Sequence, residues 1–169
     1  MEVATVSREM NEALLAFRNL VAQATPEGLR RRSSGTRWTN RQLLFHMVFG
    51  YLVVRTLMPL VRGFGRLPIR YSRRFSAVLH AARRPFHVIN YLGSCGGGQL
   101  LTPSTMVKLM ERTTSALQKR LDRETPETVA LTMAFPTSWD PYFTDTMTVL
   151  DVYHFGTQHF THHCQQLTL

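Results

Sequence analysis

The chain has 169 residues, of which 44% are hydrophobic and 18% charged, and this composition excludes an intrinsically disordered protein. The length fits one domain, residues 1–169, that buries a core without disulfides. The net charge is +9 at pH 7, and Lys108 and Lys119 are the only lysines among twenty basic residues.

The first predicted helix runs from about Ser7 to Ala24, because apolar residues recur there at steps of three and four. They are Met10, Leu14, Phe17, Leu20, Val21 and Ala24. Pro26 and Gly28 follow and end this pattern.

The second predicted helix begins after Thr39, which fits an N-cap. Gln42, three residues later, completes the pattern of a capping box. The helix is apolar nearly all round as far as Leu60, so we expect it to be the most buried of the chain.

The apolar run from Leu43 to Val61 is about as long as a membrane span. It contains His46, Arg55 and Pro59, and these residues are poorly suited to the centre of a bilayer. We therefore interpret the run as a buried helix of a bundle, and expect no membrane partner.

The segment from Arg62 to Leu101 is too long for a structureless loop. We predict a short helix over about Ser72–Ala82. Pro85 and the run Gly96-Gly97-Gly98 are interpreted as breaks, with the glycines as a flexible connection. The glycine run lacks the Lys-Ser/Thr tail of a phosphate-binding loop.

Two more helices complete the pattern. Thr102-Pro103 opens the third long helix, as a cap followed by proline in the first turn. The fourth begins near Thr144 or Asp145, because Pro136 and Pro141 exclude a helix before it. We find no convincing alternation of a β-strand, so the sequence predicts an all-α four-helix domain.

The two cysteines are too few for a disulfide framework. Cys95 lies in the predicted glycine-rich loop, and Cys164 in the last predicted helix. The first nine residues lack the basic and apolar stretches of a secretory signal. We expect both thiols to be free in a reducing cytoplasm.

Four of the seven histidines fall within ten residues in the last helix. His159 and His163 are four residues apart, so a helix places both imidazoles on one face. His46, an ionisable residue in the most apolar helix, is the third candidate ligand. Three neutral imidazoles suit Zn²⁺ or Ni²⁺, with Mn²⁺ or Fe²⁺ possible, and leave a coordination position open. The alternative is that the histidines only pack in the core.

His154 and His162 point in other directions from the same helix. Either could contact a ligand, although a surface position is the simpler interpretation. Asp140, Asp145 and Asp151 are available as catalytic acids or bases, and the sequence singles out none of them.

The positive charge lies mainly in two groups of arginines. The first comprises Arg30, Arg31, Arg32, Arg37 and Arg41, and the second Arg62, Arg66, Arg70, Arg73, Arg74, Arg83 and Arg84. A basic surface can bind nucleic acid or steer anionic small molecules. No known nucleic-acid motif accompanies these arginines, and a solvated surface is the plainer interpretation.

Several short motifs stand in a familiar order. His46 comes early in the second helix, and His159 and His163 form an H-x-x-x-H pair in the last. Trp38-Thr39 precedes the second helix, and the chain continues after His159 as His162-His163-Cys164-Gln165-Gln166-Leu167. This arrangement resembles the DinB-like superfamily of metal-binding four-helix proteins, which includes the YfiT-type proteins and the mycothiol-dependent maleylpyruvate isomerases. Cys164 stands where many relatives carry arginine.

The resemblance implies an up-down-down-up bundle, with residues 62–101 as the long crossover between helices 2 and 3. It also implies a homodimer, and an enzyme whose metal ion activates a low-molecular-weight thiol for S-transfer to an electrophile or for its isomerisation. Arg37 or Arg41 could orient an anionic thiol. The alternative is a non-enzymatic stress-response or nucleic-acid-associated bundle that uses the arginine-rich surface.

Overall fold

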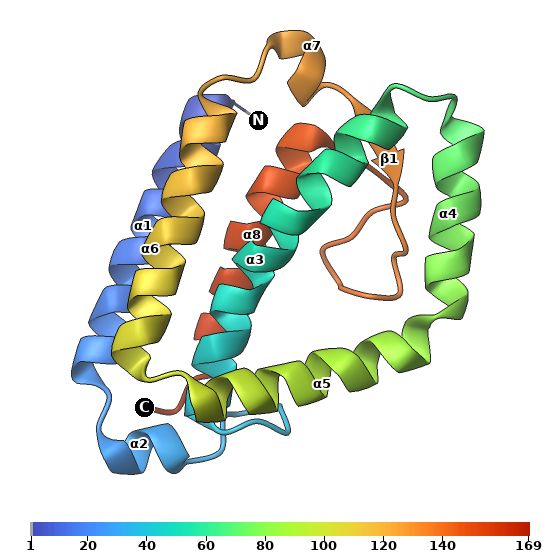
Figure 1. Cartoon of the computed structure of the whole chain (residues 1–169). Helices are drawn as coiled ribbons and strands as arrows, with labels where there is room; N and C mark the ends of the chain where they lie inside the picture. Colours follow the sequence, from blue (N-terminus) through green and yellow to red (C-terminus); the bar gives the residue numbers. More distant parts are fainter. Residues whose placement is uncertain (1) are drawn as a thin grey trace.

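Four long helices dominate the computed structural model, which describes residues 2–169. They are α1 (Val3–Gln23), α3 (Asn40–Gly65), α6 (Pro103–Leu121) and α8 (Val149–Cys164). In Figure 1, α1 and α8 run in one direction along the bundle, and α3 and α6 run in the other. The predicted all-α, up-down-down-up bundle is therefore confirmed.

The four helices enclose one core. α1 packs against α6 and α8, and α3 packs against the same two helices, so each helix has two neighbours. The largest side chains that are fully buried include Phe17, Tyr51, Met58, Met110, Leu117 and Tyr153. Burial of apolar surface of this kind is the main stabilising contribution to a helical bundle.

The start of α3 follows the predicted capping box. The Thr39 side chain accepts a hydrogen bond from the Gln42 backbone N–H, and the Gln42 side chain accepts one from the Thr39 N–H. The first helix begins at Val3, somewhat before the predicted Ser7. The predicted start is four residues late, about one turn, and the predicted end is one residue late.

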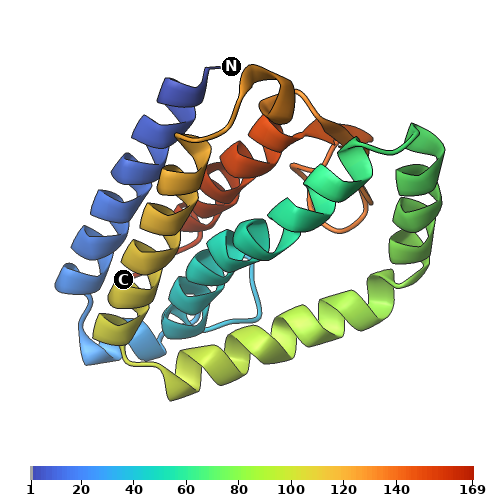
Figure 2. The ribbon, with the colours of Figure 1, turned by 45° about the horizontal axis from the view of Figure 1, so that its top comes forward.

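Two helices form the crossover between the parallel neighbours α3 and α6. They are α4 (Ile69–Ala81) and α5 (Arg83–Leu100), and both views show α5 passing across the ends of the bundle helices where α3 begins (Figures 1 and 2). α4 covers the short helix predicted for this segment. Two shorter helices, α2 (Pro26–Arg30) and α7 (Pro126–Val129), lie in the remaining connections.

The predicted break at the glycine run is wrong, whereas a break close to Pro85 is present, because α4 ends at Ala81 and α5 begins at Arg83. Pro85 lies in the first turn of α5, where its missing N–H has no helical partner to lose. Gly96, Gly97 and Gly98 lie inside α5, and Cys95 is therefore a helical residue. A Cβ at Gly98 would lie only 2.7 Å from Gln42 Cα, so glycine here permits close packing of α5 on α3.

A short sheet, which the sequence analysis did not predict, precedes α8. β1 (Thr132–Ala134) and β2 (Thr146–Thr148) are antiparallel, with Met133 opposite Met147. Strands of three residues are too short to show an alternating pattern. Because β2 occupies the residues after Thr144, α8 begins at Val149, later than predicted. The pair closes a loop, residues 135–145, that lies between α3 and α4 in Figure 1.

α3 is the one helix of residues 2–169 that is long and apolar enough to cross a membrane, judged by length and composition. Half of its most apolar window is buried within the structure. The core helix of a soluble protein passes the same test, and α3 packs against α5, α6 and α8.

Candidate metal centre

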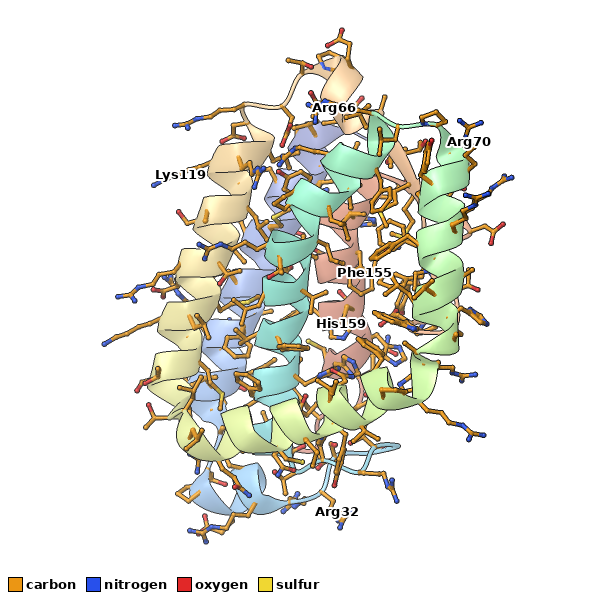
Figure 3. The ribbon with its side chains drawn as sticks, turned by 45° about the vertical axis from the view of Figure 1, so that its right-hand side comes forward. Arg32, Arg66, Arg70, Lys119, Phe155 and His159 are labelled. Carbon is orange, nitrogen blue, oxygen red and sulfur yellow. The ribbon has the colours of Figure 1, made fainter. Side chains whose placement is uncertain are left out.

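Three histidines meet where α3 and α8 pack against each other. His46 Nε2 lies 3.1 Å from His159 Nε2, and ligand atoms of His46, His159 and His163 all lie within 4.8 Å of one another. Their exposed fractions are 4%, 6% and 9%. Figure 3 shows His159 in the interior, while Arg66, Arg70 and Lys119 extend outward from the ribbon. The structure thus brings together the three histidines that the sequence analysis proposed as ligands.

Ser94 determines which nitrogen of His46 carries the proton. The Ser94 hydroxyl donates its one hydrogen to the Asn90 carbonyl at 2.8 Å. It lies 3.0 Å from His46 Nδ1, and must therefore accept from an Nδ1–H there. This tautomer leaves the Nε2 lone pair free and directed toward His159.

Gln166 has the same effect on His163. Its side-chain oxygen lies 2.6 Å from His163 Nδ1, and an amide oxygen can only accept. His163 therefore carries its proton on Nδ1 and keeps a free lone pair on Nε2. Hydrogen bonds of this kind fix the ring orientation of metal-binding histidines.

His159 is held by close packing. Its Nδ1 has no hydrogen-bond partner among the described residues. A Cβ at Gly50, one helical turn after His46, would lie 2.4 Å from that nitrogen. Gly50 therefore provides the space in which the His159 ring lies between α3 and α8.

Burial keeps all three imidazoles neutral. Desolvation, with a smaller repulsion from His163, lowers the pKa of His46 to about 3. Desolvation also lowers the pKa of His163 to about 4 and holds that of His159 well below its ordinary value. Lone pairs on neutral imidazoles are the form that binds a metal ion.

The donor set fits a divalent ion. Imidazole–metal bonds of about 2.0–2.1 Å place two nitrogens about 3.3 Å apart in a tetrahedral site. The Nε2 atoms of His46 and His159 are 3.1 Å apart. His46 and His163, whose Nε2 lone pairs are free, could hold such an ion together with His159 and leave one coordination position open.

A cavity of about 250 Å³ opens beside the three histidines. Its walls come from α3, α4, α5, α8 and the loop of residues 135–145, and they are mainly aromatic and aliphatic. Among the aromatic side chains are Trp38, Phe49, Phe86, Trp139, Phe143 and Phe155. The histidines thus face a space with mainly apolar walls.

A few polar groups line the same cavity. Asp140 accepts a hydrogen bond from the Tyr142 backbone N–H, and burial raises the pKa of its carboxyl. His162 is half-buried and lies on this wall. Asp151 instead caps α8 through Thr148, and Asp145 is exposed, so the structure distinguishes Asp140 among the three aspartates.

Neither predicted thiol-binding arginine is among the residues that line the cavity within positions 2–169. Arg41 donates from Nη2 to the carbonyls of Gln99 and Leu101 at the end of α5. Arg37 is exposed, with its guanidinium 5.9 Å from the centre of the Tyr91 ring. Tyr91 stacks on Trp38, which lines the cavity. The rings of Tyr91 and Trp38 therefore separate the Arg37 guanidinium from the cavity.

Both cysteines are free, as expected, and lie elsewhere. Burial raises the pKa of the Cys164 thiol to about 11, which makes it a poor nucleophile. His154 pairs with Glu9 at 2.9 Å, on the side of α8 that faces α1. None of these three residues lines the cavity in the described part of the chain.

The sequence analysis missed several residues of the site. Trp38, noted above only as a residue that precedes the second helix, packs against His46 with 4.3 Å between ring centres. Ser94 could not be found, because its role depends on how α5 docks. The loop of residues 135–145 did carry a signal, because four aromatic residues within nine positions are unusual in a solvated loop. They are Phe135, Trp139, Tyr142 and Phe143.

Comparison with known proteins gives one match. The family model of the DinB superfamily matches residues 9–167, nearly the whole chain. No curated protein and no solved structure matches. The matched range contains all three histidines, together with Trp38, Ser94 and Gln166.

Proposed function

The chain belongs to the DinB superfamily, and on that premise we propose that it is a metal-dependent enzyme that activates a low-molecular-weight thiol. His46, His159 and His163 would hold one divalent ion, with Zn²⁺ or Ni²⁺ preferred and Mn²⁺ or Fe²⁺ possible. The thiol would react with an electrophile by S-transfer or would catalyse its isomerisation. The observation that carries the proposal is the convergence of three neutral imidazoles at one end of a cavity.

A divalent ion at these histidines supplies Lewis acidity, which lowers the pKa of a bound thiol into the physiological range. The protein contributes the arrangement around it. Ser94 and Gln166 fix the His46 and His163 tautomers, and the mainly apolar walls would limit the approach of water to the reacting groups. The electrophile would lie in the cavity, within reach of the three histidines.

The reaction balances without an external oxidant or reductant. The electron pair of the S–H bond forms the new S–C bond, and the proton passes to the electrophile or to its leaving group. In an isomerisation the thiol adds, the substrate changes geometry, and the S–C bond breaks again to return the thiol. Asp140 is our candidate for accepting and returning the proton, because it lines the cavity and burial raises its pKa.

The polar part of the thiol would remain outside the apolar cavity. Arg37 lies next to the stacked rings of Tyr91 and Trp38, and its guanidinium is exposed. Arg41 already donates to two carbonyls, so Arg37 is the better candidate for an anionic group of the thiol.

Metal content is the first test. We would measure it by plasma mass spectrometry on tag-free protein, on His46→Ala and His159→Ala, and on His154→Ala as a control from the same helix. We expect about one equivalent of a transition metal in the wild type and in His154→Ala, and its loss in the other two. Absence of metal after incubation with Zn²⁺ and Ni²⁺ would refute the proposal. A positive result would justify screening thiols with electrophiles.

One observation favours a second candidate function. No acidic residue occurs between Glu27 and Glu111, while thirteen arginines and Lys108 do. Arg66, Arg70 and Arg73 are among those exposed at and near α4. A non-enzymatic role on nucleic acid would predict useful DNA affinity that falls steeply with salt. Affinity that is weak already at low salt would exclude it.

A further inference from the structure

A stacked pair of aromatic rings joins two walls of the cavity, α5 and the loop of residues 135–145. Phe86 of α5 and Trp139 of the loop 135–145 stack with 3.8 Å between ring centres and 11° between ring planes. The Trp139 indole also donates to the Leu79 carbonyl of α4 at 2.8 Å. The loop is therefore tied to both crossover helices, and these side chains form a preformed surface for a flat molecule.

A second series of rings leads to the histidines. The Phe143 and Phe155 rings are 4.7 Å apart, and the Phe155 and His159 rings are 5.6 Å apart. Trp38, another residue of the cavity wall, packs against His46. A planar group in the cavity would thus contact aromatic side chains along its length and end at the three imidazoles.

The volume sets the size of that group. A dry apolar cavity of about 150 Å³ holds a benzene molecule. The present cavity of about 250 Å³ has room for one substituted ring or two fused rings. A large polar molecule would have to leave most of its surface outside.

The charge of the cavity contrasts with that of the chain. Although the net charge is +9, no arginine or lysine lines the cavity within residues 2–169. The ionisable side chains that do line it are His46, His159, His162, His163, Asp140 and Tyr142. A carboxylate bound there would lose its hydration, gain no side-chain cation, and face the carboxyl of Asp140.

We infer from these walls that the cavity takes an uncharged, planar aromatic molecule of one or two rings, in preference to a carboxylate. The inference names the class of electrophile for the enzyme proposed above, and it rests on that function. The selectivity itself comes from the walls and not from a metal ion. Binding to metal-free protein can therefore test it separately.

The test compares two molecules of nearly the same shape. They are 2-acetylnaphthalene, which is neutral, and 2-naphthoate, which carries a carboxylate in place of the acetyl group. Dissociation constants would be measured by equilibrium dialysis on the metal-free full chain at pH 7. Quenching of tryptophan fluorescence would report the location, because Trp38 and Trp139 are the only tryptophans and both line the cavity.

We expect the ketone to bind about tenfold or more tightly than the carboxylate and to quench the tryptophans. Phe86→Ala should weaken ketone binding, because it removes one ring of the stacked wall. Tyr71→Ala, at an exposed aromatic residue of α4, should leave binding unchanged. If Phe86→Ala does not fold, the ratio of the two dissociation constants in the wild type still decides the question.

Equal or tighter binding of 2-naphthoate would overturn the inference, and so would the absence of binding by both molecules. An unchanged ketone affinity in a folded Phe86→Ala variant would place binding elsewhere and overturn it as well. These results are independent of the metal-content experiment. Failure of the metal site and failure of the substrate class are therefore distinguishable.

Discussion

The four-helix bundle and the α4–α5 arm, residues 69–100, bury very different side chains. The bundle encloses whole phenylalanine, tyrosine, methionine and leucine side chains. In the arm the buried residues are instead small, namely Ser72, Ser94 and Gly98. Large apolar side chains of the arm are instead exposed, among them Val78, Val88, Ile89 and Leu92.

The difference shows how the cavity is built. Three of its walls are parts of the bundle and of the loop before α8, and the arm closes it with partly buried side chains such as Leu79 and Phe86. The arm is attached by hydrogen bonds, by close contact of small residues and by a few aromatic pairs such as Phe86 with Trp139. We infer that the bundle is the stable scaffold and that the arm opens at lower free energy to admit a ligand.

The largest effect we expect is in the bundle. Arg62 pairs with Glu124, and both contact the Tyr153 hydroxyl, where α3, α8 and the end of α6 meet. Arg62→Met would leave the Glu124 carboxylate buried without its cation, at a cost of about 3–5 kcal/mol in the free energy of unfolding. Urea unfolding would measure it.

Arg8→Met is the matched control, because Arg8 forms an exposed pair with Glu12 on the surface of α1. We expect this change to cost less than about 0.5 kcal/mol. Equal destabilisation by the two variants would show that the bundle does not depend on its buried ion pair.

Hydrogen exchange directly tests the difference in stability between the bundle and the α4–α5 arm. Backbone amides in the middle of α3 and α8 should exchange only through global unfolding, because their side chains form the core. Amides of α5 should be protected about 100-fold less, because few apolar side chains hold this helix in place. Mass spectrometry of peptides from a deuterium-labelling series would measure both. Equal protection of α5 and α8 would contradict the proposed difference in stability.

Ser94 connects the arm to the histidines. In Ser94→Ala the His46 Nδ1–H loses its acceptor, and the ring loses one restraint on its tautomer. We expect zinc affinity to fall by about 10–100-fold, as for other changes to groups that orient metal-binding histidines. Competition with a chromophoric chelator would measure it. Ser104→Ala, at an exposed position of α6, is the control and should not change the affinity.

The sequence predicts the bundle better than the arm for a physical reason. Regular spacing of apolar residues reveals helices that bury one face, as in α1, α6 and α8, and α3 is revealed by its capping box and its long apolar run. The arm has glycines and a proline, which usually break helices. Pro85 is tolerated in a first turn and Gly98 is needed for contact with α3, but both facts depend on the tertiary structure.

Some residues of the candidate site could likewise be predicted from the sequence, and others could not. His159 and His163 are neighbours on one helix, so their spacing alone predicts that they share a face. Gln166 follows at the next step, and the structure shows it bonded to His163. Arg37 and Arg41 were chosen for their charge, and charge does not determine which side chains line a cavity. The apolar loop 135–145 reaches the site only through the pairing of β1 with β2.

The smallest effects we expect come from two neighbouring glycines of α5, and they have opposite signs. A Cβ at Gly98 would meet the α3 backbone at Gln42 Cα, so Gly98→Ala should push the two helices apart and cost about 1–3 kcal/mol. A Cβ at Gly96 would meet no atom within 4 Å. Gly96→Ala should therefore stabilise the protein by about 0.5–1 kcal/mol, because alanine loses less backbone entropy in a helix.

Urea unfolding of both variants shows whether each substitution lowers or raises the free energy of unfolding, provided that the arm unfolds together with the bundle. If it unfolds first, hydrogen exchange of α5 peptides gives the same comparison locally. Destabilisation by both alanines would mean that the run tolerates no side chain at all. Stabilisation by both would mean that α5 does not lie closely against α3 at Gly98.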